Sequence, residues 1–505
     1  MKSNACVCAA AAVAVLCAMG WARPAAPTPV QPVSLHPQNP HYFLFRGKAV
    51  ALLTSGEHYG AVINADFDYH KYLATLAADG LNYTRIFGGS YVEAPGKSFG
   101  ILRNDLAPGP GRYIAPWARS AVTGYAGGGN KFDLERWDAQ YFERFHEFLA
   151  GASERGIVVE ISLFSSQYGD GQWNLSALNP ANNVDMNGAG TTDYKKVQTL
   201  DNGSALGYQE LYTRKLVHEA NGFDNVIFEI QNEPWSDRPE PGGPIGAVNP
   251  MLQPPARDRF PNATELADES SLAWQGKVAE WISSEEAAMP NKHLIAQNYS
   301  NFRFPIRKLL PGVSVVNFHY ADADAAAWNY GLDKAISCDE TGFMGRDDEA
   351  YRREAWNFML SGGATFDSLD YSFSPGHEDG TDTAPNGPGG GNATLRRELK
   401  VLSDFLQSFS LTDMHPDPRL VRHATGTIPR VLSNPGREYG IYFDGDGPTE
   451  VMLELPEGRY AGAWINVRTG RIEESVEVRA GRGTMVLESP EFVNGLALRL
   501  KRTEP

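Results

Sequence analysis

Eight short apolar runs, with amphipathic helical segments between most of them, extend from residue 48 to residue 409. Each run is rich in β-branched and aromatic residues and is too short for a helix, so it predicts a buried strand. Strands that alternate with helices pair in parallel, and eight such units can close into a barrel. The sequence therefore predicts an α/β fold with a (β/α)8 TIM barrel, and a doubly wound open sheet is the alternative.

The polar ends of these strands are the candidates for function, because the C-terminal ends of barrel strands converge on one face. The predicted strands are 48–54, 82–87, 156–164, 225–233, 293–298, 313–320, 334–340 and 364–369. The predicted helices are 66–78, 132–153, 205–220, 270–288, 347–361 and 393–409.

The stretch 225–235 carries an amide and a carboxyl group at the end of its strand. It reads Asn-Val-Ile-Phe-Glu-Ile-Gln-Asn-Glu-Pro-Trp, and Pro234 stops the strand because proline cannot donate to a sheet. A carboxyl group at the tip of an apolar strand is partly removed from water, which raises its pKa. We therefore expect Glu233 to hold a proton near neutral pH and to act as a general acid.

A second strand has the same layout. The stretch 334–343 reads Lys-Ala-Ile-Ser-Cys-Asp-Glu-Thr-Gly-Phe, so a short apolar run ends in Glu340 before a glycine turn. Glycosidases that retain configuration need two carboxyl groups about 5–5.5 Å apart, one as acid/base and one as nucleophile, whereas inversion needs about 6.5–9.5 Å. The sequence predicts that Glu233 and Glu340 form a retaining pair, with Glu340 as the nucleophile.

The two motifs, Asn-Glu-Pro at 232–234 and Asp-Glu-Thr-Gly at 339–342, resemble those of the clan A glycoside hydrolases, cellulase family 5 in particular. The helical run 205–220 and the Asn-Gly-Phe-Asp-Asn-Val segment after it also resemble the region before the acid/base strand of that group. The resemblance covers roughly residues 40–412. It implies a (β/α)8 barrel with the acid/base after strand 4, the nucleophile after strand 7 and a β-linked oligo- or polysaccharide as substrate.

The resemblance also implies roles for residues at other strand ends. Arg85 on strand 2 would keep the nucleophile ionised, since a nearby cation lowers a carboxylate pKa; an ordinary internal ion pair is the alternative. Asn232 would hydrogen-bond the sugar 2-hydroxyl. His319 and Tyr320 end strand 6, where the family separates its histidine and tyrosine by one residue. Here the two are adjacent, and adjacent strand residues face opposite sides, so Tyr320 reaches the nucleophile only if the strand has ended.

Two strand ends depart from the family pattern. Strand 3 ends in Phe-Ser-Ser-Gln without a histidine, and the segment after strand 8 lacks the tryptophan that usually floors the sugar site. Asp367, Asp370 or Tyr371 would then bind the sugar through polar contacts. The sugar and the linkage stay open.

Three predicted loops, 88–131, 165–204 and 236–269, are long for a compact domain, and loops of this length are commonly functional. Trp173 lies in the second of them and Trp235 just before the third. A pyranose presents an apolar face of C–H groups to an aromatic ring, so we expect both tryptophans to bind substrate. Crowding by three loops favours a pocket or short cleft over an open groove.

The ends of the chain differ from the predicted barrel at 40–415. From residue 421 to residue 505, short strands separated by Gly and Pro predict an all-β sandwich, a stabilising accessory domain with carbohydrate binding as the alternative. Residues 1–22 join Lys2, an apolar run and small residues, which indicates a signal peptide and a secreted or periplasmic protein. The apolar run is too short to favour a membrane span. Residues 23–39 hold five prolines and predict an extended tether.

Composition and missing motifs argue against several kinds of partner and cofactor. A net charge of −16 disfavours nucleic acid as a partner, so a neutral carbohydrate substrate is expected. No phosphate-loop or dinucleotide fingerprint stands in a strand–helix context, and no His-Glu pair continues into a zinc-protease motif, so we expect no cofactor and no metal. Two alternatives stay open: a carbohydrate-binding barrel without turnover, and a serine esterase that uses Ser98 of the Gly-Lys-Ser-Phe-Gly segment.

Overall fold

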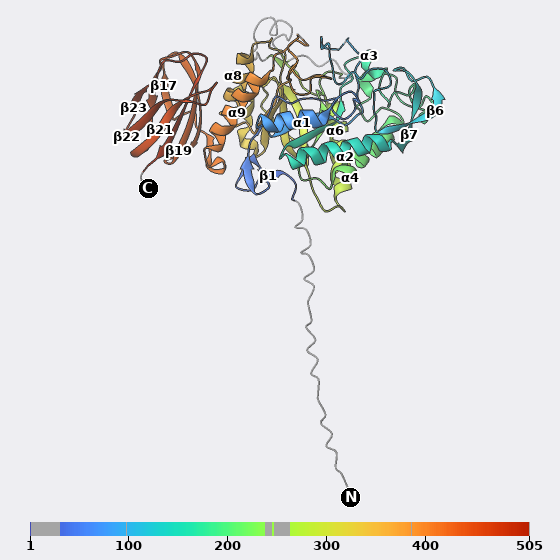
Figure 1. The fold of residues 1–505 in the computed structure, drawn as a ribbon, viewed down its shortest axis with the longest axis horizontal. Helices are drawn as coiled ribbons and strands as arrows, with labels where there is room; N and C mark the ends of the chain where they lie inside the picture. Colours follow the sequence, from blue (N-terminus) through green and yellow to red (C-terminus); the bar gives the residue numbers. More distant parts are fainter. Residues whose placement is uncertain (2–30, 97, 238–244, 247–262, 385, 504–505) are drawn as a thin grey trace. The chain divides into compact units, whose positions relative to one another are not determined.

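The computed structural model describes residues 1, 31–96, 98–237, 245–246, 263–384 and 386–503. The helices and strands below all belong to the unit that begins at residue 31 (Figure 1). Residues 2–22 of the predicted signal peptide and residues 23–30 of the predicted tether lie outside the described residues.

A parallel eight-stranded sheet forms the centre of the fold, in the order β4-β15-β14-β13-β12-β9-β8-β5. An isolated parallel bridge between Glu57 and Arg85 joins its two edges, and Phe87 N donates to Tyr59 O at 3.0 Å, so the sheet nearly closes. The predicted (β/α)8 barrel is confirmed. Its strands are β4 (Leu52–Leu53), β5 (Tyr83–Phe87), β8 (Val158–Ser165), β9 (Val226–Asn232), β12 (Leu294–Asn301), β13 (Val313–His319), β14 (Ala335–Glu340) and β15 (Thr365–Phe366).

Helices follow most barrel strands, and six of them begin after an Asp or Asn whose side chain accepts a backbone N–H of the first turn, as Asp138 does for α2. None of the described helices is long and apolar enough to cross a membrane. The helices are α1 (Tyr69–Ala78), α2 (Ala139–Glu154), α3 (Asp170–Trp173), α4 (Ala205–Ala220), α6 (Glu269–Glu286), α7 (Ala323–Asn329), α8 (Asp348–Met359) and α9 (Ala393–Gln407), with single 3₁₀ turns at Tyr194–Lys196, Tyr330–Leu332 and Leu411–Asp413.

A small antiparallel sheet corrects two predictions at the start of the chain. It pairs β1 (Ser34–His36), β2 (Asn39–Phe45) and β3 (Lys48–Val50). Only Leu52–Leu53 of the predicted strand 48–54 enters the barrel, because Arg46 and Gly47 take positive φ values of 50° and 77° and turn the chain back as a hairpin. Residues 34–36 and residue 39 are therefore paired strand rather than tether. Phe43, Phe45 and Val33 pack against the first residues of the barrel strands and cover that end of the barrel.

The predicted helix 132–153 is wrong in its first part. Residues Asn130–Trp137 form strand β7, which pairs with β6 (Trp117–Thr123) inside the predicted loop 88–131. Phe132 and Leu134 are buried and alternate with more exposed residues, which is the period of a strand. The helix begins only after Asp138. A second short hairpin pairs β10 (Ile245–Gly246) with β11 (Ala263–Thr264).

The C-terminal strands form two antiparallel sheets that share a core, so the predicted sandwich is confirmed (Figure 1). Val451 and Leu453 of the smaller sheet pack with Phe443 and Trp464 of the larger one. The larger sheet contains β16 (His415–Pro416), β18 (Thr427–Asn434), β19 (Glu438–Gly445), β24 (Leu496–Arg502), β21 (Gly458–Asn466) and β22 (Ile472–Ala480), and the smaller one β17 (Val421–Ala424), β20 (Glu450–Leu453) and β23 (Met485–Glu488).

Candidate active site

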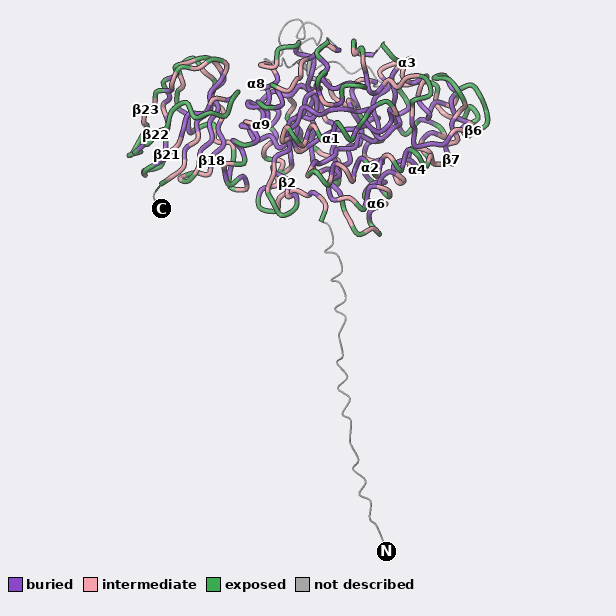
Figure 2. The backbone as a smooth tube through the Cα atoms, viewed as in Figure 1, coloured by how far each residue is buried: buried purple, intermediate pink, exposed green. Residues whose placement is uncertain are grey.

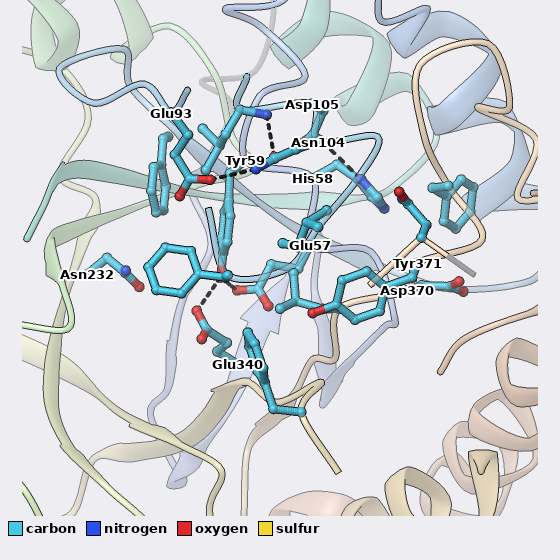
Figure 3. A pocket seen from close by; sticks show the side chains of 18 of the residues that line it. Glu57, His58, Tyr59, Glu93, Asn104, Asp105, Asn232, Glu340, Asp370 and Tyr371 are labelled. Carbon is cyan, nitrogen blue, oxygen red and sulfur yellow. Dashed lines mark hydrogen bonds and ion pairs between the residues drawn. The ribbon is translucent and has the colours of Figure 1, made fainter. Parts of the chain in front are cut away.

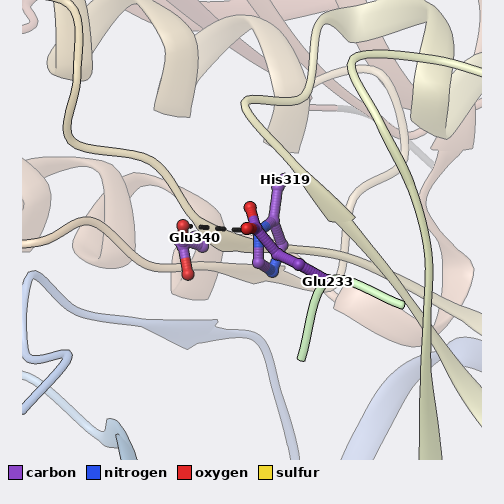
Figure 4. A group of neighbouring side chains, drawn as sticks. All are labelled: Glu233, His319 and Glu340. Carbon is purple, nitrogen blue, oxygen red and sulfur yellow. Dashed lines mark hydrogen bonds and ion pairs between the residues drawn. The ribbon is translucent and has the colours of Figure 1, made fainter. Parts of the chain in front are cut away.

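The two predicted carboxyl groups lie together at the C-terminal end of the barrel. Glu233 directly follows β9, Glu340 is the last residue of β14, and His319 ends β13 between them (Figure 4). One oxygen of each carboxyl group and a ring nitrogen of His319 lie within 4.8 Å of one another. The Glu-Glu pair indicated by the two strand motifs is thus a spatial pair.

Glu340 is surrounded by donors. Tyr320 donates to its Oε1 at 2.8 Å, the Tyr59 hydroxyl contacts its Oε2, and Arg85 Nη1 lies 3.4 Å from Oε2. Burial works to raise the pKa of Glu340, but the charges of His319 and Arg85 and the hydrogen bonds outweigh it and lower the pKa to about 2. Glu340 is therefore an ionised carboxylate over the whole neutral and mildly acidic range.

His319 is a buried cation between the two carboxyl groups. Its Nδ1 lies 2.9 Å from Glu233 Oε1 and 3.4 Å from Glu340 Oε1. Burial works to lower its pKa, but the carboxylates of Glu340 and Asp339 raise it well above its usual value. Trp235 packs edge-on against the imidazole, with ring centroids 5.5 Å apart, and so helps to hold it in place.

Three non-glycine residues at this site have left-handed backbone conformations. The φ angles are 46° at Glu233, 58° at Tyr168 and 53° at Tyr320. Each such residue costs about 1–3 kcal/mol, and strain of this kind clusters at functional sites. The left-handed conformation of Tyr320 explains how two adjacent residues both reach the site. Strand β13 ends at His319, and the turn brings the side chains of His319 and Tyr320 to the carboxyl groups.

Glu233 is the more accessible of the pair, with its side chain 13% exposed. Tyr168 donates to its Oε2 at 2.9 Å, and Asn298 accepts its backbone N–H at 2.8 Å. The Asn232 amide donates to the Tyr168 hydroxyl at 2.7 Å. Tyr168, in the loop after β8, thus contacts the predicted acid from the strand end that lacks the family histidine.

Arg85 is wholly buried, and its shortest contacts are not to the nucleophile. It lies 2.6–3.0 Å from the carboxylate of Glu229 and 2.7 Å from Glu57, and it donates to Asn232 Oδ1 at 2.7 Å. The contact with Glu340 is longer, at 3.4 Å. Arg85 is thus part of an internal ion pair with Glu229 and also places a cation beside Glu340.

Two groups of side chains have the spacing of a metal site among the described residues: Glu233, His319 and Glu340, and beneath them Glu160, Glu229 and Asp339. In the first group, the protonated His319 supplies the positive charge that a metal ion would bring. In the second, Asn317 donates to Glu160 at 2.6 Å and to Asp339 at 2.8 Å, and Arg85 contacts Glu229 and Asp339. Both groups are thus supplied with donors by the chain itself.

The lower acid group holds protons at neutral pH. Burial, with Glu229 and Asp339 nearby, raises the pKa of Glu160 to about 8. Burial also raises the pKa of Asp339 to about 7, against the opposing charge of Arg85.

A pocket with about 720 Å³ of empty space, part of it open to solvent, begins at Glu340 (Figure 3). Of the predicted binding residues, Asn232, Tyr320 and Tyr371 line it together with Glu233 and Glu340, whereas Arg85 and His319 lie behind its wall. Polar lining residues labelled in Figure 3 are Glu57, His58, Tyr59, Glu93, Asn104, Asp105, Asn232, Glu340, Asp370 and Tyr371.

The two predicted sugar-stacking tryptophans do not line this pocket. Trp173 is 1% exposed and belongs to the hydrophobic core, because the short helix α3 turns its ring inward. Trp235 is 3% exposed and supports His319 instead. The phenylalanine and tyrosine rings that do line the pocket are smaller: Tyr59, Phe87, Tyr91, Phe99, Tyr168, Tyr320, Phe343, Tyr371 and Phe373.

The sequence interpretation missed three residues of the site: Glu57, Tyr59 and Glu93. Glu57 and Tyr59 follow β4 at the same end of the barrel as the catalytic candidates. The rule that strand C-termini carry function would have pointed to them. Glu93 lies further along a long loop, where no such positional rule applies.

The fold and the site together describe a TIM barrel with two carboxyl groups at the ends of its fourth and seventh strands, followed by C-terminal antiparallel β sheets. No protein-family model matches the sequence, and no curated protein matches it. Solved structures do share the fold.

Three of these structures superpose over nearly the whole chain. One from Bacteroides vulgatus ATCC 8482, whose glycoside hydrolase assignment is itself provisional, has a TM-score of 0.62 at 12% identity, covering 95% of this chain and 84% of that one. A family 5 glycoside hydrolase from the same organism has 0.58 at 11%, covering 94% and 93%. Another glycoside hydrolase has 0.56 at 11%, covering 94% and 97%. At such identities the similarity establishes the fold alone.

Proposed function

We propose that the protein is a retaining β-glycoside hydrolase in which Glu340 is the nucleophile and Glu233 the acid/base. One observation carries the proposal: oxygens of the two carboxyl groups lie within 4.8 Å of each other. This upper limit on the oxygen–oxygen distance favours the close pairing of retaining enzymes, roughly 5–5.5 Å, over the separation of about 6.5–9.5 Å that inversion needs for its water.

The environments of the two carboxyl groups favour this division of roles. Glu340 is ionised and held by Tyr320 and Tyr59, so its lone pair is available to attack the anomeric carbon. The bond from that carbon to the leaving oxygen breaks, and Glu233, the more accessible group, gives its proton to the oxygen. The product of this step is a sugar ester of Glu340.

The second step reverses the proton transfer. Formation of the ester removes a negative charge within 4.8 Å of Glu233, which favours its ionised, basic form. Glu233 then takes a proton from a water molecule that attacks the anomeric carbon, and the sugar leaves with its original configuration.

The lining of the pocket supports a neutral β-linked oligo- or polysaccharide as substrate. It includes the ionised Glu340 together with Asp105 and Asp370, whereas its arginine, Arg103, is paired with an aspartate outside the lining. An acidic wall disfavours anionic sugars. Asn232, oriented by Arg85 and Tyr168, is placed to bind a sugar hydroxyl beside the reacting carbon, the contact that strengthens in the transition state.

Export and the C-terminal domain complete the proposal. Residues 1–22 serve as a signal peptide, so the protein acts in the periplasm or outside the cell. N-terminal sequencing of the exported protein tests this, and an intact Met1 on that protein would contradict it. The sandwich stabilises the barrel, through contacts such as Arg353 Nε with Asp444 Oδ1 at 2.7 Å.

Covalent trapping tests the catalytic assignment. The protein is incubated with activated 2-deoxy-2-fluoro β-glycosides of glucose, mannose, xylose and galactose, and peptide mass spectrometry locates the adduct. We expect one sugar on Glu340 and none in the Glu340→Gln variant. Glu143→Gln, on the exposed face of α2, is the matched control and should trap normally. An adduct on another residue would refute the assignment.

The leaving group tests the acid. Glu233→Ala should lose much more activity on alkyl glycosides than on dinitrophenyl glycosides, because a good leaving group departs without a proton. An equal loss on both would exclude Glu233 as the acid. The first product released should be the β-anomer by NMR, since the α-anomer would mean inversion.

The same experiments separate the two alternatives. A binding-only barrel would bind sugars without adduct or turnover. An esterase would cleave nitrophenyl acyl esters and lose that activity in Ser98→Ala. Ser98 lies inside the loop after β5 rather than in a strand-to-helix turn, and its hydroxyl donates to Glu93. That context does not match a nucleophile elbow.

A further inference from the structure

The direction of the substrate follows from the proposed roles, on which this inference rests. The acid contacts the oxygen of the leaving group, so the leaving part lies on the side of Glu233 and the sugar that is attacked lies on the side of Glu340. In the barrel order β9-β12-β13-β14-β15-β4-β5, the loops beyond Glu340 are those that follow β15, β4 and β5. These loops bound the space available to the non-reducing end of a substrate.

The loops that follow β4, β5 and β15 are called loops A, B and C. Loop A comprises residues 54–68, loop B residues 88–96 and 98–116, and loop C residues 367–384 and 386–392. Most of the pocket lining beyond Glu340 comes from them. A groove open to a long chain would need a gap between two of these loops.

Loops A and B are joined at Asp105. Its carboxylate lies 3.0 Å from His58 Nδ1, and its backbone carbonyl accepts the Asn64 amide at 2.9 Å. His58 and Asp105 are both buried, at 6% and 8% exposure. The contact is therefore part of the wall rather than a surface pair.

Loops B and C are joined by a denser set of bonds. Arg103 Nε contacts Asp382 Oδ2 at 2.5 Å, Arg103 N donates to Asn386 Oδ1 at 2.5 Å, and Leu102 N donates to Asn386 O at 2.7 Å. Asp382 is in turn held by the Ser374 hydroxyl at 2.6 Å. Backbone and side chain thus both tie the loops together.

Loops C and A complete the ring. Ser55 donates to Asp370 Oδ2 at 3.0 Å, and Gly56 N donates to Asp367 Oδ1 at 3.1 Å. Arg396 from α9 fixes Asp370 from behind at 2.7 Å. All three pairs of neighbouring loops are therefore bonded to each other around the space beyond Glu340.

The closed end is polar enough to bind a sugar. Glu57 Oε2 and His58 Nε2 are buried atoms of lining residues that have no hydrogen-bond partner among the described residues. Glu93, also in the lining, is oriented by Tyr91 at 2.9 Å and Asn104 at 2.5 Å. A buried polar atom without a partner is costly, and the hydroxyl groups of one bound sugar would supply partners.

We propose that loops A, B and C make this a blind pocket, so that the enzyme is exo-acting and releases one neutral sugar at a time from the non-reducing end of a β-linked chain. A substrate extended beyond that sugar would have to pass through the Asp105, Asp382 and Asp370 contacts. Glu57, His58 and Glu93 bind the hydroxyl groups of the terminal sugar.

Product analysis tests the proposal. The probes are β-1,3- and β-1,4-linked gluco-, manno- and xylo-tetrasaccharides labelled with 2-aminobenzamide at the reducing end, each with and without a benzyl ether on the terminal non-reducing sugar. We expect a monosaccharide and a labelled trisaccharide as first products from a free-ended probe. The unmodified protein should cleave the benzylated probe no faster than the Glu340→Gln variant does. First products cut at internal bonds, or cleavage of the benzylated form, would overturn the blind pocket.

This design separates the two levels of the argument. If fluoro glycosides label Glu340 but the tetrasaccharides are cut internally, the catalytic assignment stands and exo action falls. If nothing labels Glu340 and no probe is cleaved, the proposed function falls and exo action falls with it.

A loop variant adds a gain-of-function test. Asp382→Ala removes the bond to Arg103, and the ratio of internal to terminal cleavage should rise about tenfold, the order of magnitude that one charge-assisted hydrogen bond can contribute. Asp379→Ala is the matched control, because it removes an aspartate of the same loop that pairs outward with Lys71 at 2.9 Å. If the cleavage ratio changes equally in both variants, the Arg103–Asp382 contact does not close the pocket as proposed.

Discussion

Replacing Tyr59 with phenylalanine tests the electrostatic reasoning at the nucleophile. The Tyr59 hydroxyl contacts both Glu57 and Glu340 and accepts from Arg85 at 2.8 Å. It has one proton, so only one of the two carboxyl groups can accept it. Burial and the charge of Glu340 raise the pKa of Glu57 well above its usual value, so Glu57 keeps its own proton and Tyr59 donates to Glu340.

The size of the effect follows from that single bond. A hydrogen bond to a charged group is worth about 1.5–3 kcal/mol, and one pKa unit corresponds to about 1.36 kcal/mol. Tyr59→Phe should therefore raise the pKa of Glu340 from about 2 to about 3–4. At neutral pH the nucleophile stays ionised, so the loss of activity there is small. The loss grows below about pH 4, because the nucleophile then becomes protonated.

The assay is the second-order rate of inactivation by the accepted fluoro glycoside, measured from pH 3 to pH 8. The unmodified protein should show no acid limb from Glu340 in this range, and Tyr59→Phe should show one at about pH 3–4. Tyr72→Phe is the control, since that hydroxyl contacts Gly56 O at 2.6 Å and Thr84 at 2.7 Å. If Tyr59→Phe shows no acid limb, or if Tyr72→Phe shows the same limb, the reasoning is refuted.

Arg85→Met should lower the free energy of unfolding by about 3–5 kcal/mol, because it leaves the buried Glu229 unpaired; a loss below about 1 kcal/mol in chemical denaturation would contradict this. Burial raises the pKa of Glu93 from 4.5 to about 7, so the folded state holds the extra proton and loses up to about 3 kcal/mol of stability as pH rises from about 4.5 to about 7. Glu93→Gln should flatten that slope in denaturation at several pH values, and an unchanged slope would count against it. Asp444→Ala should cost about 1 kcal/mol, since its partner Arg353 is partly exposed, and thermal unfolding should show the sandwich or the whole chain melting earlier.

Most of the barrel was predictable because its strands are apolar on both faces and therefore stand out as continuous runs. The first strand was not, because residues 48–54 form one apolar run that the chain divides between a hairpin and the barrel. The turn at Arg46 and Gly47 is the local signal for that hairpin. The hairpin of β6 and β7 was missed because aromatic residues at 132 and 137 continue the spacing of the helix that follows, although Asp138 marks where it begins.

The site was predictable where chemistry coincides with a strand end, as at Glu233 and Glu340. It was not predictable where it depends on how a loop folds back. Trp173 carries the residue type that stacks on sugars, but its ring is in the core. Glu93 has no motif around it, and it enters the pocket because Asn104 and Tyr91 from the same loop hold it there.

The assignment of roles within the pair depends on surroundings that neither motif contains. Glu233 and Glu340 stand at the ends of similar strands, and sequence alone places both at the mouth of the barrel. The difference is that Glu340 lies beside Arg85 and Tyr59, whereas Glu233 is more accessible and contacts Tyr168. A carboxyl group that is held ionised can attack but cannot supply a proton, so these neighbours support the proposed roles of Glu340 as the nucleophile and Glu233 as the acid.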